Sequence, residues 1–141
     1  MVKTTINLYR ALRNGTLDGP LVTNDQPQVG LLYPRWDKDV TVSVGDTEPI
    51  VETGGGTSLH DVEGWFGFAD WRYFCIPAET PLPASLVLKK GKKTRTNKTG
   101  DLRGFHYQIE PQNPMTVDAL KGALDNLARA AVVRQVELAN A

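Results

Sequence analysis

The chain has 141 residues, of which 40% are hydrophobic, and its 16 lysines and arginines balance its 16 acidic residues to a formal net charge of zero. A chain of this length buries roughly two-thirds of its unfolded surface, so we expect one domain over residues 1–141 that folds without a metal or disulfides. The balanced charge excludes the strongly basic surface by which many proteins bind nucleic acid or anionic membranes.

The cysteine content and the lengths of the apolar runs indicate the cellular compartment in which the protein acts. Its single cysteine, Cys75, cannot form an internal disulfide, which is typical of a reducing compartment. The N-terminal residues contain no apolar stretch of the signal-peptide kind, and no apolar run approaches about 20 residues. We therefore expect no cleaved secretory signal, no transmembrane helix and a cytoplasmic place of action.

The first part of the chain predicts short strands separated by loops. Residues 4–12 alternate apolar and polar side chains and predict a strand that ends near Arg10, although part of this stretch also fits one face of a helix. After a loop, residues 28–34 predict a second strand. Residues 39–46 predict a third strand, with its valines on one face. Residues 58–68 predict an irregular segment with at most one helical turn, starting at Ser58.

The later segments are more regular. Residues 70–77 are aromatic and β-branched, which predicts a well-buried strand that ends at Pro77. A proline-marked turn then leads into a strand within residues 79–90. The polar, basic run 89–98 predicts an exposed loop, and strict alternation predicts a strand from about Gly104 to Glu110.

Residues 114–141 predict one long helix. Thr116 can cap its N-terminus and Pro114 lies just outside it. Apolar residues recur at helical spacing and give the helix a face to bury: Leu120, Leu124, Leu127 and Ala131. Many short strands followed by a single helix predict an α+β fold rather than a doubly wound sheet.

A glycine run, Gly54 to Gly56, directly precedes Thr57, Ser58 and His60. Glycine lets the backbone approach a neighbour closely, which indicates a binding site. The alternative is a flexible loop tip whose hydroxyls satisfy local backbone groups.

The strand 104–110 carries a second candidate group. His106, Gln108 and Glu110 share one face, because alternate residues of a strand point the same way, and Tyr107 shares the opposite, core-facing side with its apolar neighbours. The polar row is about 13 Å long, so its members could contact different parts of one extended ligand. The alternative is the solvent-facing side of an edge strand.

Other kinds of site find little support. His60, His106 and one cysteine do not make a zinc pattern, and no P-loop, dinucleotide-binding glycine motif or nucleophile elbow is present. We expect no metal, and we expect Cys75 to be a small buried residue with a poorly ionised thiol. The aromatic residues between Trp65 and Phe74 predict core packing, although some could wall a flat aromatic ligand.

The order of the motifs resembles the arginine-serine-glutamate type of ADP-ribosyltransferase. More closely, nearly the whole chain resembles a family of small cytotoxic effectors of type VI secretion systems with an ADP-ribosyltransferase-like fold. The matching segments are "LYRA" at 8–11, "GGTS" at 55–58, "IP" at 76–77, "HYQIEP" at 106–111, "PM" at 114–115 and "LDN" at 124–126. The middle motif reads Gly-Thr-Ser where Ser-Thr-Ser is typical.

The resemblance implies a compact α+β fold of short mixed or antiparallel strands with a C-terminal helix, and a cytotoxin that binds NAD and transfers ADP-ribose to a protein or nucleic acid inside the target cell. It implies catalytic roles for Thr57, Ser58 and Glu110, because a carboxylate stabilises the oxocarbenium-like transition state of nicotinamide release. The residues implied in NAD binding are Arg10, His60, His106, Tyr107 and Gln108. The basic run 89–98 would contact the target.

The same resemblance implies a cognate immunity protein that holds the toxin harmless in the cytoplasm of its producer. Apart from that complex we expect a monomer. Two alternatives stay open: an NAD glycohydrolase that passes ADP-ribose to water, and a non-catalytic toxin that acts by binding a target.

Overall fold

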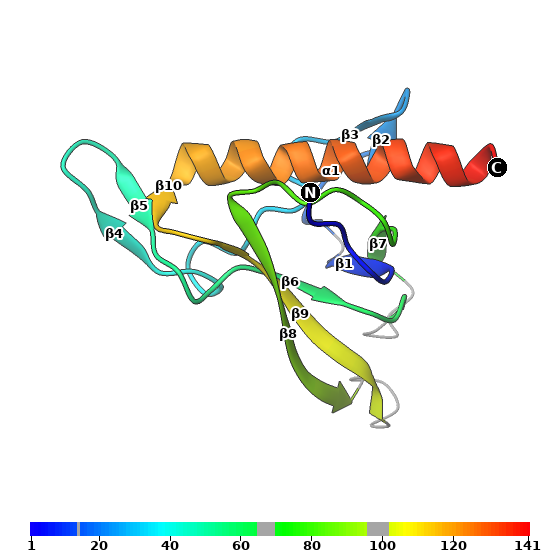
Figure 1. The fold of residues 1–141 in the computed structure, drawn as a ribbon, viewed down its shortest axis with the longest axis horizontal. Helices are drawn as coiled ribbons and strands as arrows, with labels where there is room; N and C mark the ends of the chain where they lie inside the picture. The colour runs from blue at the N-terminus through cyan, green and yellow to red at the C-terminus, as the bar shows by residue number, and fades with distance from the viewer. Residues whose placement is uncertain (14, 65–69, 96–101) are drawn as a thin grey trace.

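A five-stranded antiparallel sheet and one long helix dominate the computed structural model, which describes residues 1–13, 15–64, 70–95 and 102–141 (Figure 1). The strands lie in the order β7-β1-β6-β9-β8. Their bounds are β1 Leu8–Leu12, β6 Thr57–His60, β7 Arg72–Ile76, β8 Leu86–Arg95 and β9 Leu102–Pro111. Each neighbouring pair is antiparallel.

Two smaller sheets flank the large one. A three-stranded antiparallel sheet has the order β10-β5-β4, and its strands are β4 Val42–Val44, β5 Pro49–Val51 and β10 Met115–Thr116. The strands β2, Val22–Thr23, and β3, Gln26–Pro27, form a short hairpin. Strand β10 runs directly into the helix, so the small sheet fixes where the helix begins.

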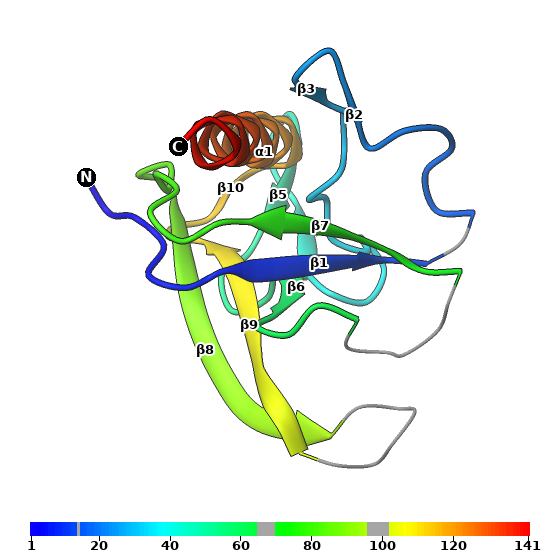
Figure 2. The same ribbon diagram turned by 90° about the vertical axis from the view of Figure 1, so that its right-hand side faces the viewer.

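The helix α1, Val117–Ala139, lies across the sheet, as the end-on view shows (Figure 2). Its 23 residues correspond to about 35 Å of length. Thr116 caps it, since its Oγ1 accepts a hydrogen bond from the backbone N of Ala119 at 3.1 Å. The four residues predicted to form the apolar face, Leu120, Leu124, Leu127 and Ala131, are all buried, which confirms that prediction.

The core lies between α1 and one face of the large sheet. Alternate strand residues point into it, and they are all buried: Leu8, Leu12, Leu59, Phe74, Ile76, Tyr107 and Ile109. The opposite, outer face carries Ser58, His60, His106 and Gln108 by the same alternation. Among the described residues, no helix is both long and apolar enough to cross a membrane.

Three of the strand predictions are confirmed, and so is the α+β class. Residues 70–77 contain β7, residues 79–90 lead into β8, and the alternating segment lies within β9. Strand β7 is less buried than predicted, because it lies at the edge of the sheet and only Phe74 and Ile76 are buried. The first strand also forms, but it extends to Leu12 rather than ending near Arg10, and it is not helical.

The predicted strand at 28–34 is wrong. These residues form turns, because Gly30 adopts a left-handed φ of +87° and the backbone N of Tyr33 donates to its carbonyl. The consecutive leucines Leu31 and Leu32 are both buried, so the apolar run reflects a loop anchored in the core.

The third predicted strand is too long, and two of the valines predicted to share one of its faces are exposed. Only Val42–Val44 forms β4, an edge strand on which Val42 is 40% and Val44 99% exposed. A three-residue edge strand has one ladder partner and little to pack against, so its apolar side chains meet solvent.

Two further segments were also mispredicted. The stretch starting at Ser58 was expected to be irregular, but Thr57–His60 forms β6, a central strand. The basic run was expected to be a loop from residue 89, but β8 continues to Arg95 and pairs with β9 as a long hairpin. The remainder of that run, 96–98, and the aromatic residues Trp65, Phe66 and Phe68 lie outside the described residues.

Candidate functional site

A pocket of about 470 Å³ opens beside strands β1, β6 and β9 and the segment that follows β3. This volume lies within the range of small-molecule sites. Its polar and charged lining residues are Arg10, Arg13, Thr16, Arg35, Asp39, Ser58, His60 and His106, and Trp71 contributes an aromatic surface. These residues are far apart in the chain and meet because β1, β6 and β9 are neighbours in the sheet.

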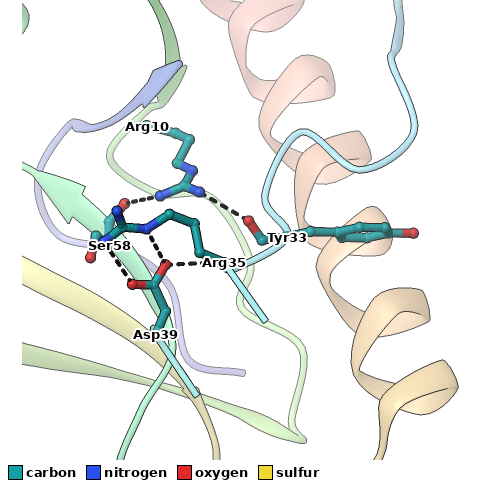
Figure 3. Close-up of polar contacts among 5 residues, drawn as sticks. All are labelled: Arg10, Tyr33, Arg35, Asp39 and Ser58. Carbon is teal, nitrogen blue, oxygen red and sulfur yellow. Dashed lines mark hydrogen bonds and ion pairs between the residues drawn. The ribbon is translucent and has the colours of Figure 1, made fainter. Parts of the chain in front are cut away.

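The guanidinium of Arg10 bridges two elements that border the pocket (Figure 3). Its Nη1 donates to the carbonyl of Ser58 on β6 at 3.0 Å, and its Nη2 donates to the carbonyl of Tyr33 at 2.9 Å. Burial lowers the pKa of Arg10, but a guanidinium stays charged in proteins. Its buried Nε has no hydrogen-bond partner within the described part of the chain.

Arg35 and Asp39 form an ion pair at the pocket (Figure 3). The Oδ1 of Asp39 accepts from Nη2 of Arg35 at 3.1 Å, and its Oδ2 accepts from the backbone N at 2.8 Å and from Nε at 3.4 Å. The Asp39 side chain is 8% exposed while that of Arg35 is 63% exposed. The pair therefore presents its cation to solvent and holds its carboxylate inside.

His60 and His106 lie directly opposite each other on β6 and β9, with ring centroids 5.3 Å apart. Burial, together with the charges of the nearby His106 and Arg10, lowers the pKa of His60 to about 4. Burial also lowers the pKa of His106, although the Asp39 carboxylate opposes that shift. Both imidazoles are therefore neutral near pH 7, the form that can accept a proton.

Four of the predicted site residues line this pocket: Arg10, Ser58, His60 and His106. Thr57 does not, because it points into the core, where it is 1% exposed and its Oγ1 donates to the carbonyl of Leu32 at 2.5 Å. The paired hydroxyls thus lie on opposite faces of β6.

The remaining predicted residues also lie outside the pocket lining. Tyr107 is 8% exposed and belongs to the core, as the strand pattern predicts. Gln108 lies opposite Ser58 on the outer face. Glu110 is 9% exposed near the end of β9, opposite Val87, beyond the part of the strand that borders the pocket.

The glycine run packs against the protein's own backbone. A Cβ at Gly56 would lie 1.9 Å from the carbonyl oxygen of Ile109, and one at Gly55 would lie 2.3 Å from the carbonyl oxygen of Asp39. Gly54 adopts a φ of +99°, which a residue with a side chain rarely takes. The close approach predicted for these glycines therefore occurs, and its partners are strand β9 and the segment that carries Asp39.

Several pocket residues were missed by the sequence analysis. Arg35 directly follows the first of two segments predicted to be strands, 28–34, and Asp39 begins the second, 39–46. Thr16 lies in a predicted loop, and Arg13 lies next to that loop. The opposite charges four residues apart were the available signal for the ion pair, but this spacing brings two side chains together reliably only in a helix.

Comparison with known proteins agrees with an α+β protein of the ADP-ribosyltransferase class. The chain belongs to the family of Tse2 ADP-ribosyltransferase toxins, whose family model matches residues 5–136. Toxin Tse2 of Pseudomonas aeruginosa is 34% identical over 155 residues, an alignment that covers 97% of this chain and 94% of that protein. Family membership confirms the predicted family, the fold class and the activity class, a toxin with ADP-ribosyltransferase activity.

Proposed function

We propose that this toxin binds NAD in the pocket beside β1, β6 and β9 and transfers its ADP-ribose to an acceptor inside a target cell. The observation that carries the proposal is the state of Arg10. Its guanidinium is largely buried, yet the two hydrogen bonds that it donates go to neutral carbonyls. The described residues give it no ion pair. The carboxylate of Asp39 acts on the Arg10 charge through space without a direct ion pair, and it is itself bound to Arg35. A buried charge with so little compensation is costly, and a bound anion would compensate it further.

The other charges support a diphosphate as that anion. Arg13 and Arg35 also line the pocket, and Asp39 is the one carboxylate among its lining residues, so the described wall carries more positive than negative charge. Planar guanidinium groups bind phosphate oxygens in pairs of hydrogen bonds. The exposed guanidiniums of Arg13 and Arg35 are accessible to the diphosphate, while Arg10 contributes charge and its free Nε donor.

The chemistry requires breaking the bond between nicotinamide and ribose. The bonding electrons leave with nicotinamide, and the ribose carbon develops positive charge before the acceptor attacks it. The neutral imidazole of His60 or His106 takes the proton of the attacking group. The hydroxyl of Ser58 donates a hydrogen bond to the ribose or to the nicotinamide amide, and Trp71 packs against the nicotinamide ring. Asp39 is the one carboxylate among the lining residues, so it would stabilise the positive charge on the ribose carbon.

Incubation of the purified chain with isotopically labelled NAD and candidate protein or RNA acceptors tests the proposal. We expect label on an acceptor. Free nicotinamide without labelled acceptor would instead identify a glycohydrolase, and no turnover would identify a toxin that acts by binding alone.

Two pocket variants and one control sharpen this experiment. Arg10→Gln removes the buried charge and should reduce transfer at subsaturating NAD about tenfold or more through a higher KM. Ser58→Ala removes the pocket hydroxyl and should also reduce transfer about tenfold or more. Arg134→Ala is the matched control, because it removes an arginine whose Nε donates to the carbonyl of Ala78, away from the pocket. Equal losses in all three variants would point to general destabilisation and contradict the site.

The cellular setting follows from the same family resemblance. We propose that residues 1–141 act as one domain and one monomer in the cytoplasm of the target cell, after delivery by type VI secretion, and that a cognate immunity protein binds the toxin in its producer. Toxicity on cytoplasmic expression, suppressed by a protein encoded beside the toxin, tests this setting. Toxicity that appears only on periplasmic expression would contradict it.

A further inference from the structure

The segment from Gly30 to Asp39, called the pocket loop below, is held by one residue of the helix. The Oδ1 of Asp125 accepts a hydrogen bond from the backbone N of Gly30 at 3.1 Å. The Oδ2 of Asp125 accepts one from the hydroxyl of Tyr33 at 2.7 Å. Both oxygens of one carboxylate thus bind the start of the pocket loop, and hydrogen bonds to an ionised acceptor are stronger than those between neutral groups.

Tyr33 connects this anchor to the site. Its ring points toward the helix, while its backbone carbonyl points the opposite way and accepts from Nη2 of Arg10 at 2.9 Å (Figure 3). The position of Tyr33 therefore decides where one of the two acceptors of the Arg10 guanidinium lies. The pocket loop then continues to Arg35 and Asp39, which line the pocket themselves.

The surroundings of Tyr33 favour this geometry. Burial, the hydrogen bond to Asp125 and its negative charge raise the pKa of Tyr33 to about 12, so its phenol stays protonated and donates at any physiological pH. The ammonium of Lys121, one helical turn before Asp125, lies 5.8 Å from the Tyr33 ring centroid. Gly30 takes a left-handed φ of +87°, and a Cβ at this position would lie 3.3 Å from the Tyr33 ring.

We propose that Asp125 is a positioning residue of the active site, which acts through Tyr33 to set the pocket loop and the guanidinium of Arg10 for the anion. The part of this inference that concerns NAD rests on the proposed function. Loss of the carboxylate would not release the whole loop, because Leu31 and Leu32 remain buried in the core and Thr57 still binds the carbonyl of Leu32. The expected effect is therefore on the pocket and not on the fold.

Four variants test the inference. Asp125→Ala removes both acceptors, and Tyr33→Phe removes one donor. Asp125→Asn is the conservative rescue, since its amide oxygen can accept from Gly30 and its NH₂ can donate to the phenol oxygen. Gln135→Ala is the matched control on the same helix, because its Nε2 donates at 2.6 Å to the carbonyl of Cys75 on β7, away from the pocket loop.

The first measurement is steady-state transfer kinetics, well below the melting temperature of each variant. Arg10 would hold the diphosphate equally in the ground state and the transition state, so Asp125→Ala should raise the KM for NAD about tenfold with kcat nearly unchanged. Tyr33→Phe should raise it less, Asp125→Asn should restore most of the affinity, and Gln135→Ala should leave it unchanged. A lower melting temperature for Asp125→Ala with an unaltered KM would overturn the inference.

The second measurement does not depend on NAD. Hydrogen exchange of the Gly30 amide and of the Arg10 Nε–H, followed by NMR, should become about tenfold faster in Asp125→Ala and stay as in the wild type in Gln135→Ala. If the wild-type chain turns over no NAD, the proposed function fails, and this exchange alone decides the inference. An unchanged hydrogen-exchange rate of the Arg10 Nε–H in Asp125→Ala would refute the inference.

Discussion

Thr57→Ala separates the structural from the catalytic interpretation of the two adjacent hydroxyls. The Thr57 hydroxyl donates at 2.5 Å to the carbonyl of Leu32 in the core, where Thr57 is 1% exposed. Leaving that carbonyl without its donor costs about 1–3 kcal/mol of unfolding free energy. Removing the buried methyl group costs about 1 kcal/mol more.

These two costs translate into a measurable shift of the melting temperature. A chain of 141 residues has an unfolding entropy of about 0.3 kcal/mol per degree. Thr57→Ala should therefore melt about 7–13 °C below the wild type in calorimetry. Thr57→Ser keeps the hydroxyl and loses only the methyl group, so its melting temperature should fall by about 3 °C.

Ser58→Ala supplies the comparison. Its hydroxyl lies on the pocket face and its carbonyl, which Arg10 binds, is retained, so the melting temperature should change by less than about 2 °C while transfer falls. The assay is calorimetry of each variant beside its NAD turnover below the melting temperature. A Thr57→Ala protein with wild-type stability and no turnover would refute the reasoning, because Thr57 would then contact substrate.

Three further predictions concern the sheet, the histidine pair and the helix cap. Gly56→Ala forces a Cβ against the Ile109 carbonyl of β9 and should cost about 3 kcal/mol or more in urea unfolding, and a near-neutral result would contradict the packing of the glycine run. The pKa of His60 in the folded chain, about 4, lies below its ordinary value of 6.5, so between these pH values the unfolded chain binds more protons. The unfolding free energy should therefore keep its full value above pH 6.5 and fall as the pH drops toward 4. His60→Gln should make this pH dependence less steep. Thr116→Ala removes the N-cap acceptor for Ala119 and should lower the unfolding free energy by about 1 kcal/mol, whereas Thr116→Asn should be close to neutral.

The elements that the sequence predicted correctly are those whose own pattern determines their structure. The helix has a cap, a repeating apolar face and enough length for the pattern to be unambiguous. In β9 the alternation of Tyr107 and Ile109 with polar neighbours continues long enough to define both faces.

The mispredicted elements depend on tertiary contacts. Strand β6 contains Thr57 at a core position, and a threonine there is acceptable because the Leu32 carbonyl, 25 residues earlier, accepts its hydrogen bond. Leu31 and Leu32 read as a buried strand, but Gly30 turns the chain and the helix residue Asp125 holds the turn. A local sequence pattern does not indicate hydrogen-bond partners that lie this far apart in the chain.

The candidate site shows the same division. Ser58, His60 and His106 could be placed on one surface once their strands were known to be neighbours. Arg10 could be assigned to the same site only from the order of the family motifs. The ion pair of Arg35 and Asp39 could not be predicted, because it forms in a loop whose path is set by packing against Gly55. Loops whose course is set by distant segments are where sequence patterns inform least.

The most direct test of the central claim is a crystal structure of the chain with a non-hydrolysable NAD analogue. We predict the diphosphate within hydrogen-bonding distance of the pocket arginines, with the nicotinamide ring toward Ser58 and the two histidines. Saturable binding at any other place on the molecule, such as the cavity lined by Met1, Leu82 and Ala130, would contradict the account. So would an analogue that does not bind at millimolar concentration while the chain remains folded and toxic.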